Sequence, residues 1–393
     1  MGVVAPTGAT KESFWDGLRD GRCAIVSRDF AADDLSLSQV CAPVEDAADQ
    51  LKGLGRDGAR VDRVTQLALV AADEAIADSG FDFNDDRANR AACIIGTGIG
   101  GQATLDNAYV GMLRKGRRPH PSSILKLIPN APASMVSIRH GLRGPSFAVA
   151  SACASGAHAI GVCADIIRHG GADIGVAGAS ESILTYGAME AWRSMHILAD
   201  ETCRPFSRNR NGLVIGEGAG IFVLEEEEAA KARGAKIYGR IAGFGMNADG
   251  NDMINPSMEG AATAMSLALD NVKIDDPSCV YINAHGTGTL MNDPTETKAI
   301  REVFGGDADA LVVSSTKSMH GHLLGAAGGI ETAASLLALR DGLAPPTINY
   351  DEPDPECDLN YAPNACVERD FKIAISNSFA FGGLNAVLAF ERL

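Results

Sequence analysis

The sequence predicts an α/β protein built from two similar halves. Short apolar runs such as AACII at 91–95 and CVYIN at 279–283 have the length and character of buried strands. Longer segments such as 61–79 carry apolar residues at helical spacing. Two such series follow one another, each with a turn rich in Gly, Ser and Ala that leads into an apolar helix, after Cys153 and after His322. This pattern indicates an internal duplication.

The first half is expected to open with a helix through Phe14 and Leu18. Residues 19–60 are rich in Asp, Ser and Gly, and we predict a loop there. A helix over 61–79 should end at Gly80, because Gly readily adopts the left-handed conformation that terminates helices. The remaining predicted elements are strands over 91–95, 146–150, 173–179 and 220–224, helices over 157–169 and 225–233, and a long excursion over 102–145.

The second half is expected to begin near Ala235 and to repeat the alternation of strands and helices. Its last helix is the most apolar, which predicts a buried position. The predicted strands are 237–245, 279–283, 311–315, 371–376 and 386–390, and the predicted helices are 260–271, 294–304 and 325–340.

The composition is that of a folded protein with an acidic surface. Hydrophobic residues make up 46% of the 393 residues, and the net charge of -16 argues against nucleic acid as a partner. No apolar run approaches the roughly 20 residues of a membrane-spanning helix, and the start lacks the pattern of a signal peptide. The nine cysteines, an odd number without a C-x-x-C pair, argue against a disulfide framework or a zinc site. We therefore expect a soluble cytoplasmic protein without a metal site.

A glycine run, GTGIGG at 96–101, follows the predicted strand at 91–95. It is similar to a dinucleotide-binding loop, but it lacks the G-x-x-G spacing and the acidic residue after a second strand. We favour a tight turn that lines a pocket, and we expect no bound cofactor.

Cys153 lies in the turn SACASG at 151–156, between a predicted strand and a predicted helix. The strand, 146–150, is small and apolar, as a strand buried on both faces should be. At the N-terminus of a helix, unpaired N–H groups and the helix dipole stabilise a thiolate and lower the pKa of a thiol. Taken alone, this turn fits either a reactive nucleophile or the inert buried cysteine that is common inside proteins.

Two further turns, both in the second half, carry histidine. NAHGTGT at 283–289 places His285 after one predicted strand, and SSTKSMHGH at 314–322 places His322 after another. Ligands of α/β proteins bind at the carboxyl ends of strands. A histidine beside glycine can also be a structural turn residue, but one cysteine and two histidines in three such turns predict a shared active site.

Four motifs, taken in order, resemble those of the β-ketoacyl-acyl carrier protein synthases, above all the elongating type II enzymes. They are A-C-x-S-G at Cys153, N-A-H-G-T-x-T at His285, K-S-x-x-G-H-x-x-G-A-A-G at His322, and N-S-F-x-F-G-G at 377–383. The resemblance extends over nearly the whole chain.

The resemblance implies a duplicated thiolase-like fold of five layers, α-β-α-β-α, with two mixed sheets, assembled as a homodimer. Residues 1–234 would form the half with the nucleophile and the cap and dimer insertions, and 235–393 the half with both catalytic histidines. The implied enzyme is an acyltransferase that joins malonyl units to acyl chains by decarboxylative Claisen condensation. Both substrates would be phosphopantetheine thioesters of acyl carrier protein.

By the same resemblance, Cys153 takes the acyl group while His285 and His322 flank it. Loss of CO2 from a malonyl thioester leaves an enolate oxygen that needs fixed hydrogen-bond donors, and two imidazoles supply them without a full charge. The backbone N–H groups of Cys153 and Phe381 are expected to hold the acyl carbonyl oxygen. Phe381 is also expected to border the acyl channel.

Other positions take supporting roles from the resemblance. Lys317 is expected to order the histidine loops as a buried ammonium paired with Glu331. Thr287 and Thr289 would hydrogen-bond the pantetheine arm, although threonines here could also cap a turn. Ile99 would border the acyl channel and limit chain length, and its other interpretation is ordinary core packing.

An acidic carrier protein requires a basic landing surface on this acidic chain. Arginines and lysines are ordinarily solvated charges, but some fall where the carrier would dock. The candidates are Arg60, Arg63, Arg114, Lys115, Arg117, Arg118, Arg204, Arg208 and Arg210.

The sequence departs from the family in several places. The chain begins near the T-G turn, so the first strand is expected to be absent or shortened. Ala380 replaces a usual glycine and Leu384 a common threonine, and Ala380 is expected to stiffen the loop of Phe381. His320 falls at a variable position of its motif, and we interpret it as structural.

Rival functions fit the residues less well. A degradative thiolase needs a second cysteine in a Gly-rich turn, and Cys366 has no glycine beside it. A coenzyme A-primed initiating enzyme would use Cys-His-Asn, and a non-catalytic chain-length subunit would lack the nucleophile. Two functions stay open: elongation of fatty acyl chains, or the same chemistry dedicated to a specialised lipid or polyketide.

Overall fold

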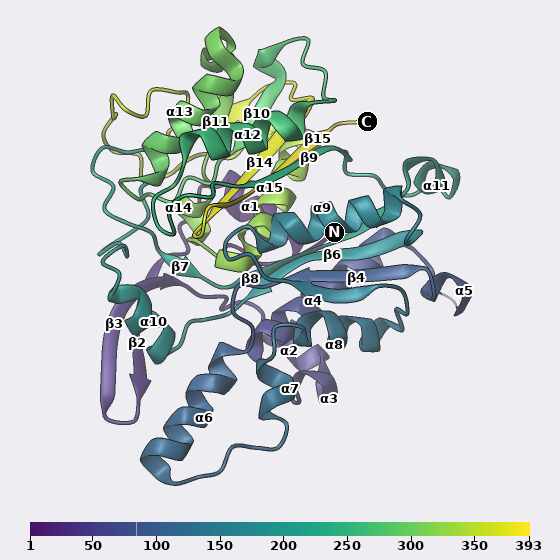
Figure 1. Cartoon of the computed structure of the whole chain (residues 1–393), viewed down its shortest axis with the longest axis vertical. Helices are drawn as coiled ribbons and strands as arrows, with labels where there is room; N and C mark the ends of the chain where they lie inside the picture. Colours follow the sequence, from purple (N-terminus) through teal and green to yellow (C-terminus); the bar gives the residue numbers. More distant parts are fainter. Residues whose placement is uncertain (84) are drawn as a thin grey trace.

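Two five-stranded sheets enclose a central helical layer in the computed structural model, which describes residues 1–83 and 85–393 (Figure 1). The central layer consists of α9 (Ser155–Arg168) and α15 (Ala327–Asp341). Each of these helices contacts strands of both sheets. The two halves of the chain therefore share one core.

Outer helices complete the layers. Helices α4 (Arg63–Ser79) and α8 (Ala131–His140) cover the first sheet, and α12 (Met258–Leu269) and α13 (Asn292–Phe304) cover the second (Figure 1). The five-layer α-β-α-β-α arrangement expected from the sequence is thus confirmed. Helix α4 ends at Gly80, which has a φ of 59°, as the sequence predicts.

The two sheets have the same topology. The first contains β1 (Gly2–Val4), β4 (Ala91–Gly96), β5 (Ser146–Val149), β6 (Ile174–Glu181) and β8 (Gly218–Glu225); the second contains β9 (Arg240–Ala248), β10 (Val280–Asn283), β11 (Val312–Ser314), β14 (Ile373–Ala380) and β15 (Leu384–Glu391). Their spatial orders are β1-β8-β6-β4-β5 and β9-β15-β14-β10-β11. Counted along the chain, both read 1-5-4-2-3, with matching parallel and antiparallel pairs. The predicted duplication is confirmed, and we propose that the halves, 1–234 and 235–393, meet near Ala235.

Helices α9 and α15 approach each other closely where both begin. A Cβ atom on Gly156 would lie 2.7 Å from the backbone nitrogen of Gly329, and one on Gly328 would lie 2.5 Å from that of Ala157. Only glycine avoids these contacts. The crossing brings the turn before α9, with Cys153, against the loop before α15.

Residues 19–60 are not a loop, and that prediction is wrong. They contain β2 (Val26–Ala32), β3 (Leu35–Ala42), α2 (Ala48–Gly53) and α3 (Gly55–Gly58). Strands β2 and β3 form an antiparallel hairpin in which Phe30 and Leu37 face each other across the strands and are buried. The other side chains of the hairpin are mostly exposed, so its polar composition is that of a solvated sheet face.

Strand β5 lies at the edge of its sheet, so the prediction that it is buried on both faces is wrong. Among the described strands it pairs with β4 alone, and Ser146 and Phe147 are exposed. A small, apolar composition is compatible with both edge and central positions. The first strand is present: β1 has three residues, which pair with β8.

The other predicted strands and helices are present within a few residues of their expected limits. None of the described helices combines the length and apolarity that a membrane span requires. The remaining elements are α1 (Lys11–Arg19), α5 (Asp85–Ala88), α6 (Gln102–Lys115), α7 (Ser123–Leu127), α10 (Tyr186–Arg193), β7 (Ile215–Gly216), α11 (Glu227–Ala232), α14 (Lys317–His320), β12 (Leu343–Ala344), β13 (Val367–Glu368) and the 3-10 turns η1 (Pro277–Cys279), η2 (Gly305–Ala310) and η3 (Leu324–Ala326).

Candidate active site

Cys153, His285 and His322 meet at one cavity of about 270 Å³. The Sγ atom of Cys153 lies 3.1 Å from Nε2 of His322. The imidazole rings of His285 and His322 are nearly perpendicular, with centroids 5.3 Å apart. The three residues come from the turn after β5, the loop after β10 and the loop after α14, and all three are buried. The shared site expected from the three turns is therefore present.

The turn before α9 presents Cys153 to the cavity. Ala152 has a φ of 47°, a left-handed conformation that is uncommon for residues other than glycine. The hydroxyl of Ser155 accepts the backbone N–H of Ser151 at 2.9 Å and donates to the carbonyl of Ala152 at 2.7 Å. The serine thus holds the strained turn in place.

The hydrogen bonds of His322 indicate where its ring proton lies. Its Nδ1 accepts the backbone N–H of Leu324 at 3.2 Å. Burial and the nearby Lys317 ammonium hold the pKa of His322 well below its usual value, so the ring is neutral. A neutral ring that accepts at Nδ1 carries its proton on Nε2. His322 therefore donates a hydrogen bond to the sulfur of Cys153.

His285 is oriented in the same sense by Lys317. The ammonium of Lys317 lies 3.5 Å from Nδ1 of His285, and an ammonium can only donate. Burial and this ammonium hold the pKa of His285 well below its usual value, so its ring proton is also on Nε2. The expected partner of Lys317 is present, because Lys317 and Glu331 form a fully buried ion pair.

Two buried carboxylates that the sequence analysis missed support the His285 loop. Glu296 accepts the backbone N–H groups of His285 and Gly286 at 2.8 and 2.7 Å. Asp293 accepts that of Thr287 at 3.1 Å. Asp293 lies in the first turn of α13 and Glu296 directly after it, close behind the motif. One sequence signal could have identified them: they are acidic residues near the start of a helix that follows a Gly-rich loop.

Burial raises the pKa of the Cys153 thiol to about 12. The charges of Glu181 and Glu331 act in the same direction, while Lys317 and a hydrogen bond from the backbone of Phe381 oppose them. The pKa of this thiol is therefore raised, where a lowered pKa was expected at the helix N-terminus, and desolvation by burial is the largest cause. The thiol is protonated at neutral pH.

Three of the four residues expected to contact the pantetheine arm or the acyl chain lie at the cavity. Thr287, Thr289 and Phe381 line the cavity. The hydroxyls of Thr287 and Thr289 lie 2.9 Å apart, and that of Thr289 also accepts the backbone N–H of Asn292 at 3.3 Å, so this threonine caps the turn as well. The sequence analysis missed the loop that begins at Asp249, which forms another wall with Ile254, Asn255 and Pro256.

Ile99 and His320 are not among the described residues that line the cavity. Ile99 is 42% exposed, so a single chain does not place it at an enclosed channel. His320 is buried against the ring of Phe14, and its Nδ1 donates to the carbonyl of Gly321 at 2.8 Å. This position agrees with a structural role for His320.

The predicted landing surface contains fewer available charges than the sequence suggests. Arg63 pairs with Glu217, Arg204 with Asp351, Arg210 with Asp354, and Arg114 and Lys115 with Asp34 and Asp33. The candidates that remain exposed outside such pairs are Arg60, Arg117, Arg118 and Arg208. Arg208 is three residues from Asn211, which lines the cavity.

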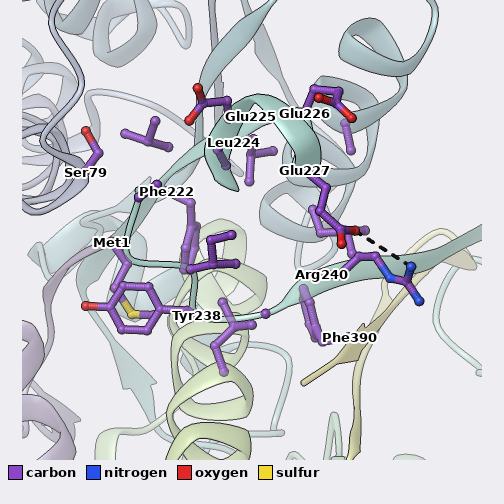
Figure 2. A pocket seen from close by; sticks show the side chains of 18 of the residues that line it. Met1, Ser79, Phe222, Leu224, Glu225, Glu226, Glu227, Tyr238, Arg240 and Phe390 are labelled. Atoms are coloured by element: carbon purple, nitrogen blue, oxygen red, sulfur yellow. Dashed lines mark ion pairs between the residues drawn. The ribbon is translucent and has the colours of Figure 1, made fainter. Parts of the chain in front are cut away.

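A second, larger cavity of about 400 Å³ lies between α9 and the segment from β8 to β9. Its wall includes Phe222, Leu224 and Tyr238, and at its rim Arg240 lies 3.8 Å from Glu227 (Figure 2). None of the described residues that line it is a cysteine or histidine. The described residues also contain no cluster of three or more His, Cys, Asp or Glu that could hold a metal. The smaller cavity is therefore the candidate active site.

Comparisons with known sequences identify similar proteins along the whole chain. The family models for the β-ketoacyl synthase N-terminal and C-terminal domains match residues 1–230 and 238–351. Nodulation protein E of a Rhizobium species is 42% identical over 400 residues, covering 100% of this chain and 98% of that protein. The 3-oxoacyl-acyl-carrier-protein synthase 2 of Staphylococcus aureus is 40% identical over 405 residues, covering 100% of this chain and 97% of that protein.

Solved structures agree with these matches. A β-ketoacyl synthase from Burkholderia phymatum is 33% identical, with a TM-score of 0.89, covering 100% of this chain and 98% of that one. A type II polyketide ketosynthase, AntDE, solved in complex with its acyl-carrier protein AntF, is 31% identical, with a TM-score of 0.88, covering 100% of this chain and 97% of that one.

The reactivity of Cys153 should rise steadily with pH. Because its thiol pKa is about 12, the thiolate fraction should increase by about tenfold per pH unit between pH 7 and 9. Peptide-resolved mass spectrometry of iodoacetamide alkylation would measure this rate, with the exposed Cys23 as the control for the reagent. A rate that levels off below pH 8 would contradict the raised pKa.

Proposed function

Because the chain belongs to the β-ketoacyl synthase family and is an acyltransferase of the 3-oxoacyl-acyl-carrier-protein synthase 2 type, we propose that it elongates acyl chains on Cys153. The extending unit is malonyl carrier protein, and the reaction is a decarboxylative Claisen condensation. One observation supports this most directly: the Nε2–H of His322 donates to the sulfur of Cys153 in a cavity that His285 shares.

In the first half-reaction the acyl group moves from the carrier to Cys153. The sulfur attacks the thioester carbon, and the backbone N–H groups of Cys153 and Phe381 hold the developing oxyanion. The His322 hydrogen bond stabilises negative charge on the sulfur as the thiol proton leaves. That proton goes to the departing pantetheine sulfur, so the exchange of thioesters is proton-neutral overall.

In the second half-reaction malonyl carrier protein enters the same cavity. The Nε2–H groups of His285 and His322 donate to its thioester oxygen, and loss of CO2 leaves an enolate on that oxygen. The enolate carbon attacks the acyl thioester, the β-ketoacyl product leaves on the carrier, and Cys153 takes up one proton from solvent. Lys317 keeps the Nδ1 of His285 unprotonated, and Thr287 and Thr289 position the pantetheine arm.

The pathway is elongation of fatty acyl chains. A specialised lipid is the second candidate, because nodulation protein E and synthase 2 relatives match at nearly equal identity, 42% and 40%. The two candidates share the chemistry and differ in the acyl group accepted. Condensation rates across a panel of acyl carriers of different length and unsaturation distinguish them.

The carrier docks near the cavity mouth. A carrier protein is present on the related ketosynthase AntDE. On this chain Arg208 is the exposed, basic residue beside the cavity wall at Asn211, and Arg60, Arg117 and Arg118 extend the basic surface. These charges attract an acidic partner despite the net charge of -16.

The protein forms a homodimer through β5. The free edge of this strand has unpaired backbone groups, which favour pairing with another strand. Apolar side chains are exposed on β5 and on the neighbouring α6, α7 and α8: Leu113, Ile124, Leu125, Ile138 and Phe147. Antiparallel pairing of two β5 strands about a twofold axis covers this surface and joins the two sheets.

The cysteines fit a reducing compartment. All nine are free thiols, and Cys93, Cys163 and Cys203 are fully buried. A cytoplasmic location keeps such thiols reduced.

Substitutions at different site residues should affect acylation and condensation differently. Wild-type protein incubated with acyl carrier protein should gain one acyl group, visible by intact mass, and Cys153→Ala should gain none. His285→Ala should still be acylated but should lose about 100-fold or more in condensation, because an enolate donor is removed. His320→Ala is the matched control and should condense within about threefold of wild type.

If the Cys153→Ala variant were still acylated, the assignment of Cys153 as the nucleophile would be wrong. A loss of condensation in His320→Ala equal to that of His322→Ala would show that the two histidines are ranked wrongly.

Charge reversal at the mouth should weaken the carrier complex. Arg208→Glu should raise KM for acyl carrier protein by about fivefold with kcat little changed, and the difference should shrink at high salt. Lys273→Glu, an exposed reversal after α12, should leave KM unchanged. If KM rose equally for both variants, the net charge of the protein alone would explain the weaker binding, and docking at this mouth would be contradicted.

Disruption of β5 should dissociate the dimer. Phe147→Lys places a charge on the free strand edge and should shift sedimentation velocity profiles from dimer toward monomer. Leu267→Lys on α12, which is 49% exposed before substitution, should leave the dimer intact. A wild-type monomer at micromolar concentration, or a dimer unaffected by Phe147→Lys, would contradict pairing through β5.

A further inference from the structure

Glu181 is a fully buried carboxylate to which the mechanism above assigns no role. It ends β6, and its oxygens accept the hydroxyl of Thr97 at 3.0 Å and the backbone N–H groups of Gly98 and Gly325 at 2.5 and 3.1 Å. It forms no ion pair with any described residue. A buried carboxylate without a cation is costly, so these three donors, together with the backbone of Ile99, are what maintains it.

The three donors belong to two segments that border the active site. Thr97 and Gly98 begin the turn after β4, which carries Ile99. Gly325 follows Leu324, whose backbone N–H fixes the Nδ1 of His322. Leu324 has a φ of 48°, so the backbone that fixes the imidazole is itself in an uncommon conformation that needs external support.

The fit around this carboxylate leaves no space for larger residues. A Cβ atom on Gly98 would lie 2.7 Å from Oε2 of Glu181, and one on Gly325 would lie 2.6 Å from the same oxygen. The Gly325 Cβ would also lie 2.2 Å from the backbone nitrogen of Gly98. Glycine at both positions therefore allows one carboxylate oxygen to bind two backbone N–H groups.

Glu181 is also linked through one residue, Thr97, to the turn that carries Cys153. The backbone carbonyl of Thr97 accepts the hydroxyl of Ser155 at 3.3 Å, and the same hydroxyl holds the turn of Cys153. Four charged or polar groups bear on this thiol: Lys317 of α14 and the backbone of Phe381 favour its ionised form, while Glu181 of β6 and Glu331 of α15 oppose it. The neutral His322 donates to the sulfur and adds no net charge. Glu331 is neutralised by its ion pair with Lys317, whereas Glu181 has no such partner among the described residues.

We propose that Glu181 is a positioning residue with two effects: it holds the Leu324 backbone that orients His322, and its charge opposes ionisation of Cys153 before substrate arrives. The proposal deepens the proposed function and rests on it for the condensation readout. Burial raises the pKa of this carboxyl to about 7, against the hydrogen bonds that stabilise its ionised form. The ionised form therefore predominates above that pH, where thiolate formation is also favoured.

Glu181→Gln should separate the two effects. The amide keeps the size of the side chain but removes the charge and turns one acceptor into a donor. Alkylation of Cys153 at pH 8.5 should become about threefold to tenfold faster, while condensation should fall by about tenfold or more because His322 loses its support. If Glu181 had only a structural role, Glu181→Gln would slow both alkylation and condensation, or neither.

Glu181→Asp is the matched variant, because it keeps the charge and shortens the reach. Its alkylation rate and pH profile should stay near those of wild type, while condensation should fall as in Glu181→Gln. Glu190→Gln, which removes a carboxylate from α10, controls for loss of charge elsewhere. If Glu181→Gln does not fold, Thr97→Val, which removes only one donor, should show a smaller change in the same two directions.

Alkylation that is unchanged or slower in Glu181→Gln, or condensation that is preserved in both variants, would overturn the proposal. Alkylation requires no carrier substrate, so it reports on Glu181 independently of the proposed function. If wild-type protein is not acylated by acyl carrier protein, the proposed function fails, and the alkylation result still decides whether the charge of Glu181 acts on Cys153.

Discussion

The hydrogen bond from His322 to Cys153 is the interaction on which the rest of the site depends. It joins residues 169 positions apart, one from each half of the chain. Its geometry requires the close crossing of α9 and α15, which the glycines at their first turns allow. The duplicated fold therefore has a structural consequence for the site: the proposed nucleophile comes from one copy of the topology, and the histidines that flank it come from the other.

Electrostatic neutrality is the second constraint on this cavity. A charged imidazole beside Cys153 would stabilise a thiolate, but burial and Lys317 keep both histidines neutral. The ammonium of Lys317 is itself balanced by Glu331. The site therefore binds developing negative charge with N–H groups rather than with cations. Such donors stabilise an enolate at little cost in the resting state, where a buried net charge would be expensive.

The sequence predicted well which three turns meet at the cavity, because its signals are local. The turns at Cys153, His285 and His322 each follow a strand, and the common direction of parallel strands brings them to one side. The predictions that failed concern properties that depend on what surrounds a segment in the fold. Composition alone could not show that β5 is an edge strand, nor that burial raises the pKa of Cys153. Glu181 gave no motif, since its donors on Thr97, Gly98 and Gly325 are far away in the sequence.

The edge position of β5 also bears on Ile99, which the sequence placed at the acyl channel. In a single chain Ile99 is 42% exposed and outside the cavity lining. Its turn follows β4, the strand that pairs with β5, so it lies beside the edge at which we propose that two copies pair. Ile99 can be exposed in a single chain and still border the acyl channel only if the second copy covers this turn. Chain-length selection would then be a property of the assembled dimer, whereas the residues proposed to act with Cys153 all lie within each chain.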